Sequence, residues 1–465
     1  MSLGWLQLAG LLGLPLVAGI GVLARMRLPL SCARLAWLAW AWVAGLLVLG
    51  LFLYAWVLAE APLARAPLAF GAIALALFAS GLRKLKASAS APLEDTVARA
   101  PTWERWLWRA SVFAILALAV SRVAASAAIP VLEGDEANYW TLRAKLLWQH
   151  GGISAGFLAD SVDTELIYHP AYPFFNSLLQ LWSFCWAGGI DAFAARIAIV
   201  ACGPALWLAL AGLLARVARP CVGAVLLWIT ATLPLTQSAS RFAESDLLSA
   251  LGMVVALDGW LRVRADRGEG WRVLALGCAF FLWSKNEGAL WIAAALAGTL
   301  VAAFLPGGAR FAVLRPRRAW LWALVPALFV ALTAGYNAYH GFSNDLTSGD
   351  YRGKGMLALL VEQFPERTAP VLAWFAKHVW FDRDTVVVYV ALLAVLVARP
   401  AWIRRRELNA PVFALLFASA GLVLVYVATP HPIPQHLETS AHRVAWTLFP
   451  VAIVLLARAT EPERT

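Results

Sequence analysis

Long apolar stretches separated by short polar segments make up most of the sequence. Stretches of about 17–25 apolar residues are long enough to cross a bilayer as helices. Candidate spans lie at residues 4–24, 35–57, 63–82, 110–129, 190–215, 220–240, 245–262, 272–284, 286–305, 319–339, 384–398, 411–429 and 444–459. The pair 272–284 and 286–305 requires a tight turn within residues 284–288. The pattern therefore predicts an all-α polytopic membrane protein with about 13 transmembrane helices.

The charged residues indicate which loops share a side of the membrane. Basic residues concentrate in every second loop, at 25–34, 83–86, 216–219, 262–272, 310–318 and 399–406, and the remaining loops hold most of the acids. The positive-inside rule places the basic loops in the cytoplasm. The acidic loops are then outside.

Residues 170–189 are apolar enough for a further span, but a crossing there would turn the basic segments 310–318 and 404–406 outward. We therefore expect a surface-lying or re-entrant helix on the outer face. The whole segment 131–189 becomes one outer loop. A second helix is expected at 136–149, because its leucines and tryptophans form an amphipathic pattern suited to the membrane interface.

The loops divide the chain into four regions. Residues 1–82 hold three N-terminal spans, and residues 83–109 form a cytoplasmic linker whose Trp-rich stretch 103–109 is expected to anchor at the inner interface. Residues 110–305 form a core with the outer loop 131–189. Residues 306–465 form a C-terminal region with outer loops at 340–383 and 430–443.

Composition supports the membrane assignment. The 465 residues are 62% hydrophobic and 14% charged, whereas soluble domains carry about 25% charged residues. The net charge of +11 is explained by the basic loops, so it does not indicate a nucleic-acid partner. The five cysteines lie in apolar stretches without metal-type spacing and are expected to pack in the interior. The first apolar stretch lacks a basic leader and a cleavage site, which favours a retained span over a signal peptide.

Three carboxylates, Glu133, Asp135 and Glu136, follow span 110–129 directly. An acidic group is costly in hydrocarbon, so the cluster must lie at the water edge of the membrane. Carboxylates there can act as a general base, bind a divalent metal or cap the next helix. A cap needs one acid and here there are three, which favours a functional role.

Further polar residues fall in the other outer loops. They are His169, Tyr172, Arg241, Glu244, Asp246, Lys285, Glu287, His436 and Arg443. If they converge on one wet cavity, the cations can neutralise a phosphate while a carboxylate takes a proton from an attacking hydroxyl. Structural roles remain open alternatives. Glu244 and Asp246 can cap the helix that begins at 245, and Arg443 can anchor at the interface.

The order of short motifs resembles a known family. The motifs are Asp135-Glu136, His169-Pro-Ala-Tyr-Pro173, Phe193–Arg196, Arg241 to Asp246 and Ser284–Gly288. Together they are similar to the polyprenyl-phosphate-sugar-dependent glycosyltransferases of the GT-C fold. The nearest group is the protein O-mannosyltransferase and aminoarabinose transferase superfamily, which is glycosyltransferase family 39-like. The resemblance covers residues 110–305.

The resemblance implies a GT-C-type helical bundle with a catalytic first outer loop that contains interfacial helices. Asp135 would be the catalytic carboxylate, and Glu136 would support it or share a divalent metal with it. Lys285 would lie near the donor phosphate, Arg443 is a further phosphate contact, and Asp246 matches the second-loop acid. The single Pro170 departs from the commoner double proline, so the role of His169 does not carry over directly.

The implied reaction moves a sugar from a polyprenyl-phosphate donor to a hydroxyl of a lipid, polysaccharide or protein acceptor, with inversion. The implied location is a bacterial inner membrane, with the active site facing the periplasm. Besides a divalent metal, no cofactor is implied. The rival interpretation is a transporter or flippase for a lipid-linked or anionic substrate, which predicts charges at the bilayer midplane and paired broken helices.

Overall fold

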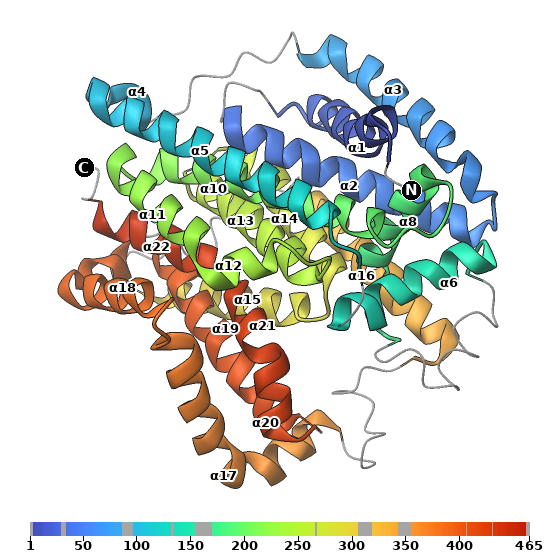
Figure 1. Ribbon diagram of the computed structural model, residues 1–465. Helices are drawn as coiled ribbons and strands as arrows, with labels where there is room; N and C mark the ends of the chain where they lie inside the picture. The colour runs from blue at the N-terminus through green and yellow to red at the C-terminus, as the bar shows by residue number, and fades with distance from the viewer. Residues whose placement is uncertain are drawn as a thin grey trace.

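The structure is a computed structural model that describes residues 3–28, 34–85, 96–131, 134–153, 170–265, 267–305, 319–342, 355–405, 407–429 and 431–461. All regular structure in these ranges is helical (Figure 1). Seven helices are long and apolar enough to cross a membrane, or eight if the bent pair 433–446 and 449–460 forms one span. The chain is therefore an all-α, multi-pass membrane protein, and the count of 13 spans stays a prediction.

The helices fall into three groups along the chain. The first comprises α1 (Trp5–Arg25), α2 (Arg34–Leu58) and α3 (Ala66–Leu85). The second comprises α4 (Thr96–Arg99), α5 (Thr102–Ala127), η3 (Glu136–Thr141), α6 (Leu142–His150), α8 (Phe175–Ala187), η4 (Ala194–Arg196), α9 (Ile197–Val200), α10 (Cys202–Val217), α11 (Pro220–Thr232), α12 (Pro234–Ala239), α13 (Ser245–Arg264), α14 (Gly270–Ser284) and α15 (Gly288–Phe304). The third comprises α16 (Ala319–His340), α17 (Met356–Phe375), η6 (Ala376–Trp380), α18 (Val386–Ala398), η7 (Pro400–Arg404), α19 (Asn409–Ala428), α20 (Ile433–His436), η8 (Leu437–Ala441), α21 (His442–Trp446) and α22 (Phe449–Thr460).

Small residues bring α1 and α2 into backbone contact. A Cβ added at Gly19 would lie 1.7 Å from the carbonyl oxygen of Ala41, and one added at Gly45 would lie 1.8 Å from that of Pro15. Without a strong hydrophobic drive in lipid, such close approach supplies the dispersion contacts that hold apolar helices together. A larger side chain at either glycine would force the two helices apart.

Helix α8 corrects the expectation for residues 170–189. It lies in the predicted segment, but it is buried rather than surface-lying. The indole Nε1 of Trp182 donates a hydrogen bond to the carbonyl oxygen of Leu11 (2.9 Å), and the Phe175 ring stacks on Trp283 at 4.7 Å. The surface-lying alternative is wrong because the N-terminal helices cover α8, and the re-entrant alternative stays a prediction.

The structure confirms two further predicted elements and changes two predicted boundaries. The helix predicted at 136–149 is confirmed as η3 and α6, and the predicted turn at 284–288 is confirmed between α14 and α15. The stretch 103–109 belongs to α5 itself, so the linker ends earlier than predicted. Span 220–240 breaks before Pro234 into α11 and α12.

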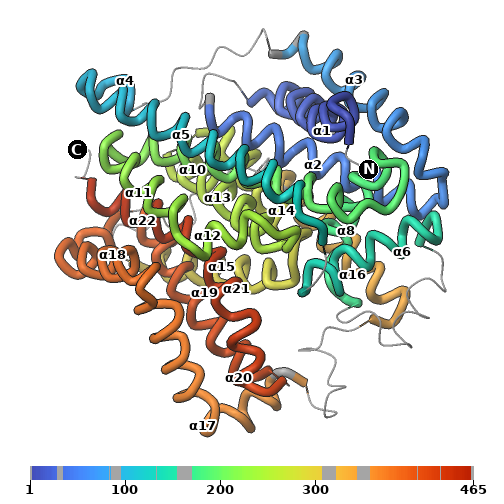
Figure 2. Tube along the Cα trace, in the orientation of Figure 1, coloured from blue at the N-terminus to red at the C-terminus, as the bar shows by residue number. Residues whose placement is uncertain are grey.

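The predicted outer loop 340–383 contains the helix α17, which the sequence analysis missed. Its prolines Pro365 and Pro370 and its charged residues interrupt the apolar pattern by which spans are recognised. Helix α17 packs against α19 and projects from the bundle near α20 (Figure 2).

Among the described residues, parts of several predicted basic loops meet at one end of the bundle, and parts of the predicted acidic loops meet at the other. At the basic end, Arg219 pairs with Glu104 (2.6 Å), and its backbone N–H donates to the carboxylate of Glu461 (2.9 Å). At the acidic end, Asp135 contacts Arg443. The contacts agree with the alternation read from the sequence, and the orientation in the membrane stays a prediction.

Candidate functional site

Charged side chains from five separate segments meet at the acidic end of the bundle, and we name them the outer cluster. Its members are Asp135, Glu136, Arg196, Glu244, Asp246, Lys285, Glu287 and Arg443. The segments are the start of η3, η4, the start of α13, the α14–α15 turn, and α21.

Arg443 joins two carboxylates from distant parts of the chain. Its Nη2 lies 2.5 Å from Oδ2 of Asp135, and its Nη1 lies 2.5 Å from Oε1 of Glu244. The side chain of Asp135 is 61% exposed, whereas those of Arg443 and Glu244 are mostly covered. Asp135 is thus the carboxylate of this group that an incoming substrate can reach.

Lys285 forms the second centre of the cluster. Its Nζ lies 3.0 Å from Oδ1 of Asp246 and 3.1 Å from Oε1 of Glu287. The extended backbone at Lys285, between two helices, directs the ammonium group toward the start of α13. Burial opposes the charge, but the carboxylates of Asp246 and Glu287 hold the pKa of Lys285 well above its usual value. Lys285 is therefore a fixed cation at neutral pH.

The same surroundings favour the charged form of Lys285 but disfavour the charged form of Glu244. Burial and the nearby charge of Asp246 raise its pKa, against the attraction of Arg443. Two acids close together cannot both be ionised without a cost, so the two cations of the cluster are needed to hold them. The cluster is an alternating network rather than a set of isolated pairs.

Glu136 fixes the position of its exposed neighbour. Its Oε2 accepts a hydrogen bond from Nη2 of Arg196 (2.6 Å), and its Oε1 contacts the Arg196 Nε and accepts the backbone N–H of Ala243 (3.0 Å). Arg196 also donates to the carbonyl oxygen of Ile129 (2.9 Å). These bonds tie η3, η4 and the segment before α13 together, with Asp135 at the edge.

A metal shared by Asp135 and Glu136 does not fit this arrangement. Both carboxylate oxygens of Glu136 are already engaged by Arg196. In the described ranges, no group of three or more His, Cys, Asp or Glu side chains could hold a metal ion. We therefore derive no role for a metal.

A chain of buried, hydrogen-bonded polar side chains links η3, α8 and the start of α13. Thr141 Oγ1 donates to Gln180 Oε1 (2.6 Å), and Gln180 Nε2 donates to Asn176 Oδ1 (2.9 Å). Asn176 Nδ2 then donates to the carbonyl oxygen of Ala243 (2.9 Å) and to Ser245 Oγ (3.1 Å). Sequence reasoning missed these residues. The available signal was the polar positions 176, 180 and 183 at i, i+4 and i+7 on one face of an apolar helix.

Sequence reasoning also missed Arg143, which is fully buried. Its Nη1 donates to Tyr139 Oη (2.7 Å) and to the carbonyl oxygen of Tyr172 (3.0 Å), and its guanidinium lies 4.0 Å from the ring centre of Phe174. The ring of Tyr172 packs edge-on against Trp140 at 5.7 Å. This aromatic packing fixes the segment that leads from Tyr172 into α8.

Four predicted site residues are not members of the outer cluster, and one of them is Tyr172, which belongs to the aromatic packing around Arg143. His169, like Glu133 of the acidic triplet, lies outside the described residues. Arg241 is exposed, and its side chain forms no hydrogen bond or ion pair within the described ranges. His436 lies apart from Arg443, where its Nδ1 shares a hydrogen bond with Thr429 Oγ1 (2.6 Å) and its ring packs against Tyr426 at 4.8 Å.

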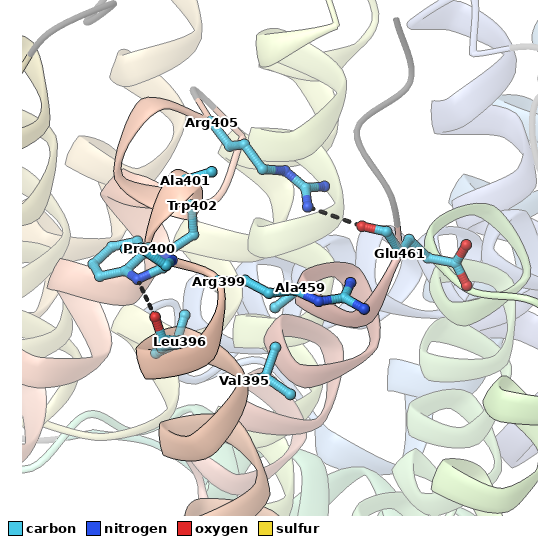
Figure 3. A pocket seen from close by; sticks show the side chains of 9 residues that line it. All are labelled: Val395, Leu396, Arg399, Pro400, Ala401, Trp402, Arg405, Ala459 and Glu461. Atoms are coloured by element: carbon cyan, nitrogen blue, oxygen red, sulfur yellow. Dashed lines mark hydrogen bonds between the residues drawn. The ribbon is translucent and has the colours of Figure 1, made fainter.

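The two best-formed cavities do not enclose the outer cluster. The larger, of about 380 Å³, lies at the basic end (Figure 3). The smaller, of about 10 Å³, has room for a single water. It lies among Tyr54, Tyr172, Phe174, Trp283 and Tyr336. The predicted convergence is therefore seen as a network that reaches the surface at Asp135.

A scan of the sequence against protein-family models gives no match, and comparisons with curated proteins and with solved structures give none either.

Proposed function

We propose that this protein is a membrane glycosyltransferase that moves a sugar from a polyprenyl-phosphate donor to an acceptor hydroxyl at the outer cluster. The observation that carries the proposal is the contact between one exposed carboxylate, Asp135, and an arginine 308 positions away, Arg443, which belongs to the same network as Lys285. An accessible base beside fixed cations suits a reaction in which a hydroxyl loses a proton and a phosphate leaves.

In the proposed reaction, Asp135 accepts the proton of the acceptor hydroxyl as its oxygen attacks the anomeric carbon. The bond from that carbon to the phosphate oxygen breaks, and polyprenyl phosphate leaves with its negative charge. Arg443 and Lys285 stabilise this charge. A single displacement of this kind inverts the anomeric configuration. Arg443 would then exchange part of its contact with Asp135 for the phosphate when the donor binds.

The other members of the cluster act in this proposal as positioning residues. Glu136 holds η3 through Arg196, whereas Asp246 and Glu287 orient the ammonium group of Lys285. We propose a bacterial inner membrane as the location, with the cluster on the periplasmic side. The acceptor belongs to one of three classes: lipid, polysaccharide or protein.

The test is sugar transfer by Asp135→Asn, measured with a radiolabelled polyprenyl-phosphate sugar in membranes that contain the full chain. Loss of the base should lower turnover by about 10²–10⁴-fold. Folding should be kept, because the amide has the shape of the carboxylate. Asp191→Asn is the matched control, since Asp191 accepts the backbone N–H groups of Phe193 and Ala194 and an amide oxygen can still accept them.

Full transfer by Asp135→Asn would remove Asp135 from the proposed role. Equal losses in Asp135→Asn and Asp191→Asn would assign the effect to folding of the outer loop instead. No transfer by the unchanged protein, from any of several polyprenyl-phosphate sugars to membrane acceptors, would contradict the transferase proposal as a whole.

A further inference from the structure

The cavity of about 380 Å³ lies far from the outer cluster, where the end of α18, η7 and the end of α22 meet (Figure 3). Its lining combines apolar side chains with two arginines and one glutamate, namely Val395, Leu396, Arg399, Pro400, Ala401, Trp402, Arg405, Ala459 and Glu461. Basic loops gather at this end of the bundle, which the positive-inside rule assigns to the cytoplasm. The proposed transfer reaction makes no use of this cavity.

Arg399 gives the cavity a positive charge, whereas Arg405, the other basic residue of the lining, pairs with Glu407 at 3.1 Å. Nη1 of Arg399 donates to the carbonyl oxygen of Thr460 (2.7 Å), and within the described ranges no carboxylate pairs with Arg399. Glu461 faces Arg405 with its backbone carbonyl, at 3.0 Å, and its carboxylate turns away (Figure 3). That carboxylate instead accepts the backbone N–H of Arg219. The remaining donors of Arg399 are thus available to an anion.

The apolar wall continues onto a surface suited to lipid. Val395 and Leu396 belong to α18, whose residues Val387, Leu393 and Val397 are all exposed. A row of exposed aliphatic side chains on a helix of this composition indicates contact with acyl chains. Trp402 lies where the apolar and basic parts meet, a position that Trp favours at the membrane interface.

We propose that this cavity binds the headgroup of an anionic phospholipid from the leaflet on that side, with its phosphate on Arg399 and its acyl chains along α18. Basic pockets between membrane helices at a cytoplasmic surface suit such headgroups. The volume of about 380 Å³ lies within the range of sites for small molecules. The ligand class follows from the combination of an apolar wall with a guanidinium, that of Arg399, which pairs with no carboxylate among the described residues.

The experiment is native mass spectrometry of the purified full chain after exchange into micelles. The micelles contain equal amounts of phosphatidylglycerol and phosphatidylcholine with the same acyl chains. The unchanged protein should retain phosphatidylglycerol in preference. Arg399→Gln should lower that occupancy by at least about fivefold, the effect of one basic residue at an anionic surface. Phosphatidylcholine occupancy should stay the same.

Two further variants distinguish a specific lipid site from nonspecific attraction between anionic lipids and the basic residues of this end. Arg404→Gln removes a neighbouring exposed charge that does not line the cavity, so it should keep the preference. Ala401→Phe keeps every charge and fills the cavity, so it should lose the lipid even if Arg399→Gln folds poorly. Equal losses in Arg399→Gln and Arg404→Gln, or full retention by Ala401→Phe, would overturn the proposal. Displacement of the lipid by an equal concentration of inorganic phosphate would assign the cavity to a soluble phosphate and also overturn it.

Discussion

Both ends of the bundle gather acidic and basic side chains, but they use them differently. At the outer end, Asp135 is 61% exposed and shares Arg443 with Glu244. At the basic end, Asp258 is 2% exposed and lies 2.5 Å from Arg216 and 3.0 Å from Arg262. The first network ends at the surface, whereas the second is closed inside the protein.

This difference separates groups that hold helices from groups that can meet a substrate. A buried carboxylate between two arginines cannot easily exchange partners, because a charge left unpaired inside the protein would cost several kcal/mol. A carboxylate at the surface loses little when its arginine moves to a phosphate. The comparison therefore supports a packing role for the buried ion pairs of Asp258 and is consistent with the proposal that chemistry takes place at the outer end.

The largest effect is expected for Asp258→Ala, which tests the packing role of the buried ion pairs at the basic end. The change leaves Arg216 and Arg262 without the carboxylate that joins them, and Arg262 is fully buried. Loss of one member of a buried ion pair lowers the free energy of unfolding by about 3–5 kcal/mol. Chemical denaturation in detergent, followed by circular dichroism, measures it. A variant as stable as the unchanged protein would break the comparison.

A smaller effect is expected for Glu136→Gln, which weakens the attachment of η3 to Arg196. Displacement of Asp135 by about 1 Å should lower kcat by up to about 10²-fold. KM for the donor should change little, since the phosphate contacts remain. Steady-state kinetics separates the two constants. A rise in KM at constant kcat would instead place Glu136 at the donor, and Glu136→Asp should recover part of kcat if positioning is the cause.

The two glutamates Glu244 and Glu407 should give the smallest effects, with opposite signs. Burial works against the charge of Glu407, but a backbone hydrogen bond and the nearby Arg458 and Arg405 lower its pKa. Its contribution to stability is present above its unfolded pKa of about 4.5 and disappears as the pH falls through the folded value. Glu244 has a raised pKa, so its ionisation costs stability as the pH rises above 4.5.

Melting temperatures between pH 4 and 8 should therefore diverge for the two amide variants. At pH 7, Glu407→Gln should melt about 2 °C lower than the unchanged protein, and Glu244→Gln should melt at the same temperature or about 2 °C higher. Both differences should shrink toward pH 4. The same sign for both variants at pH 7 would show that the two ends do not differ in this respect.

The sequence predicted those parts of the structure in which one local pattern decides the outcome. Apolar length and turn residues located the α14–α15 turn and the helix after Asp135, and the alternation of charge grouped those parts of the loops that the structure describes. Helix α8 was misassigned because its burial depends on α1 and α3, which are distant in sequence. Helix α17 was missed because Pro365 and Pro370 interrupt the apolar pattern by which a helix is recognised.

The candidate site, like the fold, could be predicted from the sequence only in part. The identities of Asp135, Asp246, Lys285 and Arg443 could be found, because charges are conspicuous in an apolar chain. Their pairing could not, since only the packed bundle brings Arg443 to Asp135. Arg143 was missed because its partners, Tyr139 Oη and the carbonyl oxygen of Tyr172, carry no charge. The polar residues of α8 do form a helical pattern, but only the packed bundle shows what they bind.

The most direct measurement compares Lys285→Gln with Arg405→Gln, one cation from each end of the bundle. Sugar transfer from a labelled polyprenyl-phosphate donor and thermal unfolding would be measured on the same preparations. The account predicts that Lys285→Gln loses transfer per folded molecule, although removal of Lys285 also lowers stability because it leaves the buried Asp246 without its closest cation. Arg405→Gln should lower the melting temperature and keep the transfer rate per folded molecule. Unchanged transfer by Lys285→Gln, or loss of transfer in folded Arg405→Gln, would contradict the assignment of chemistry to the outer end.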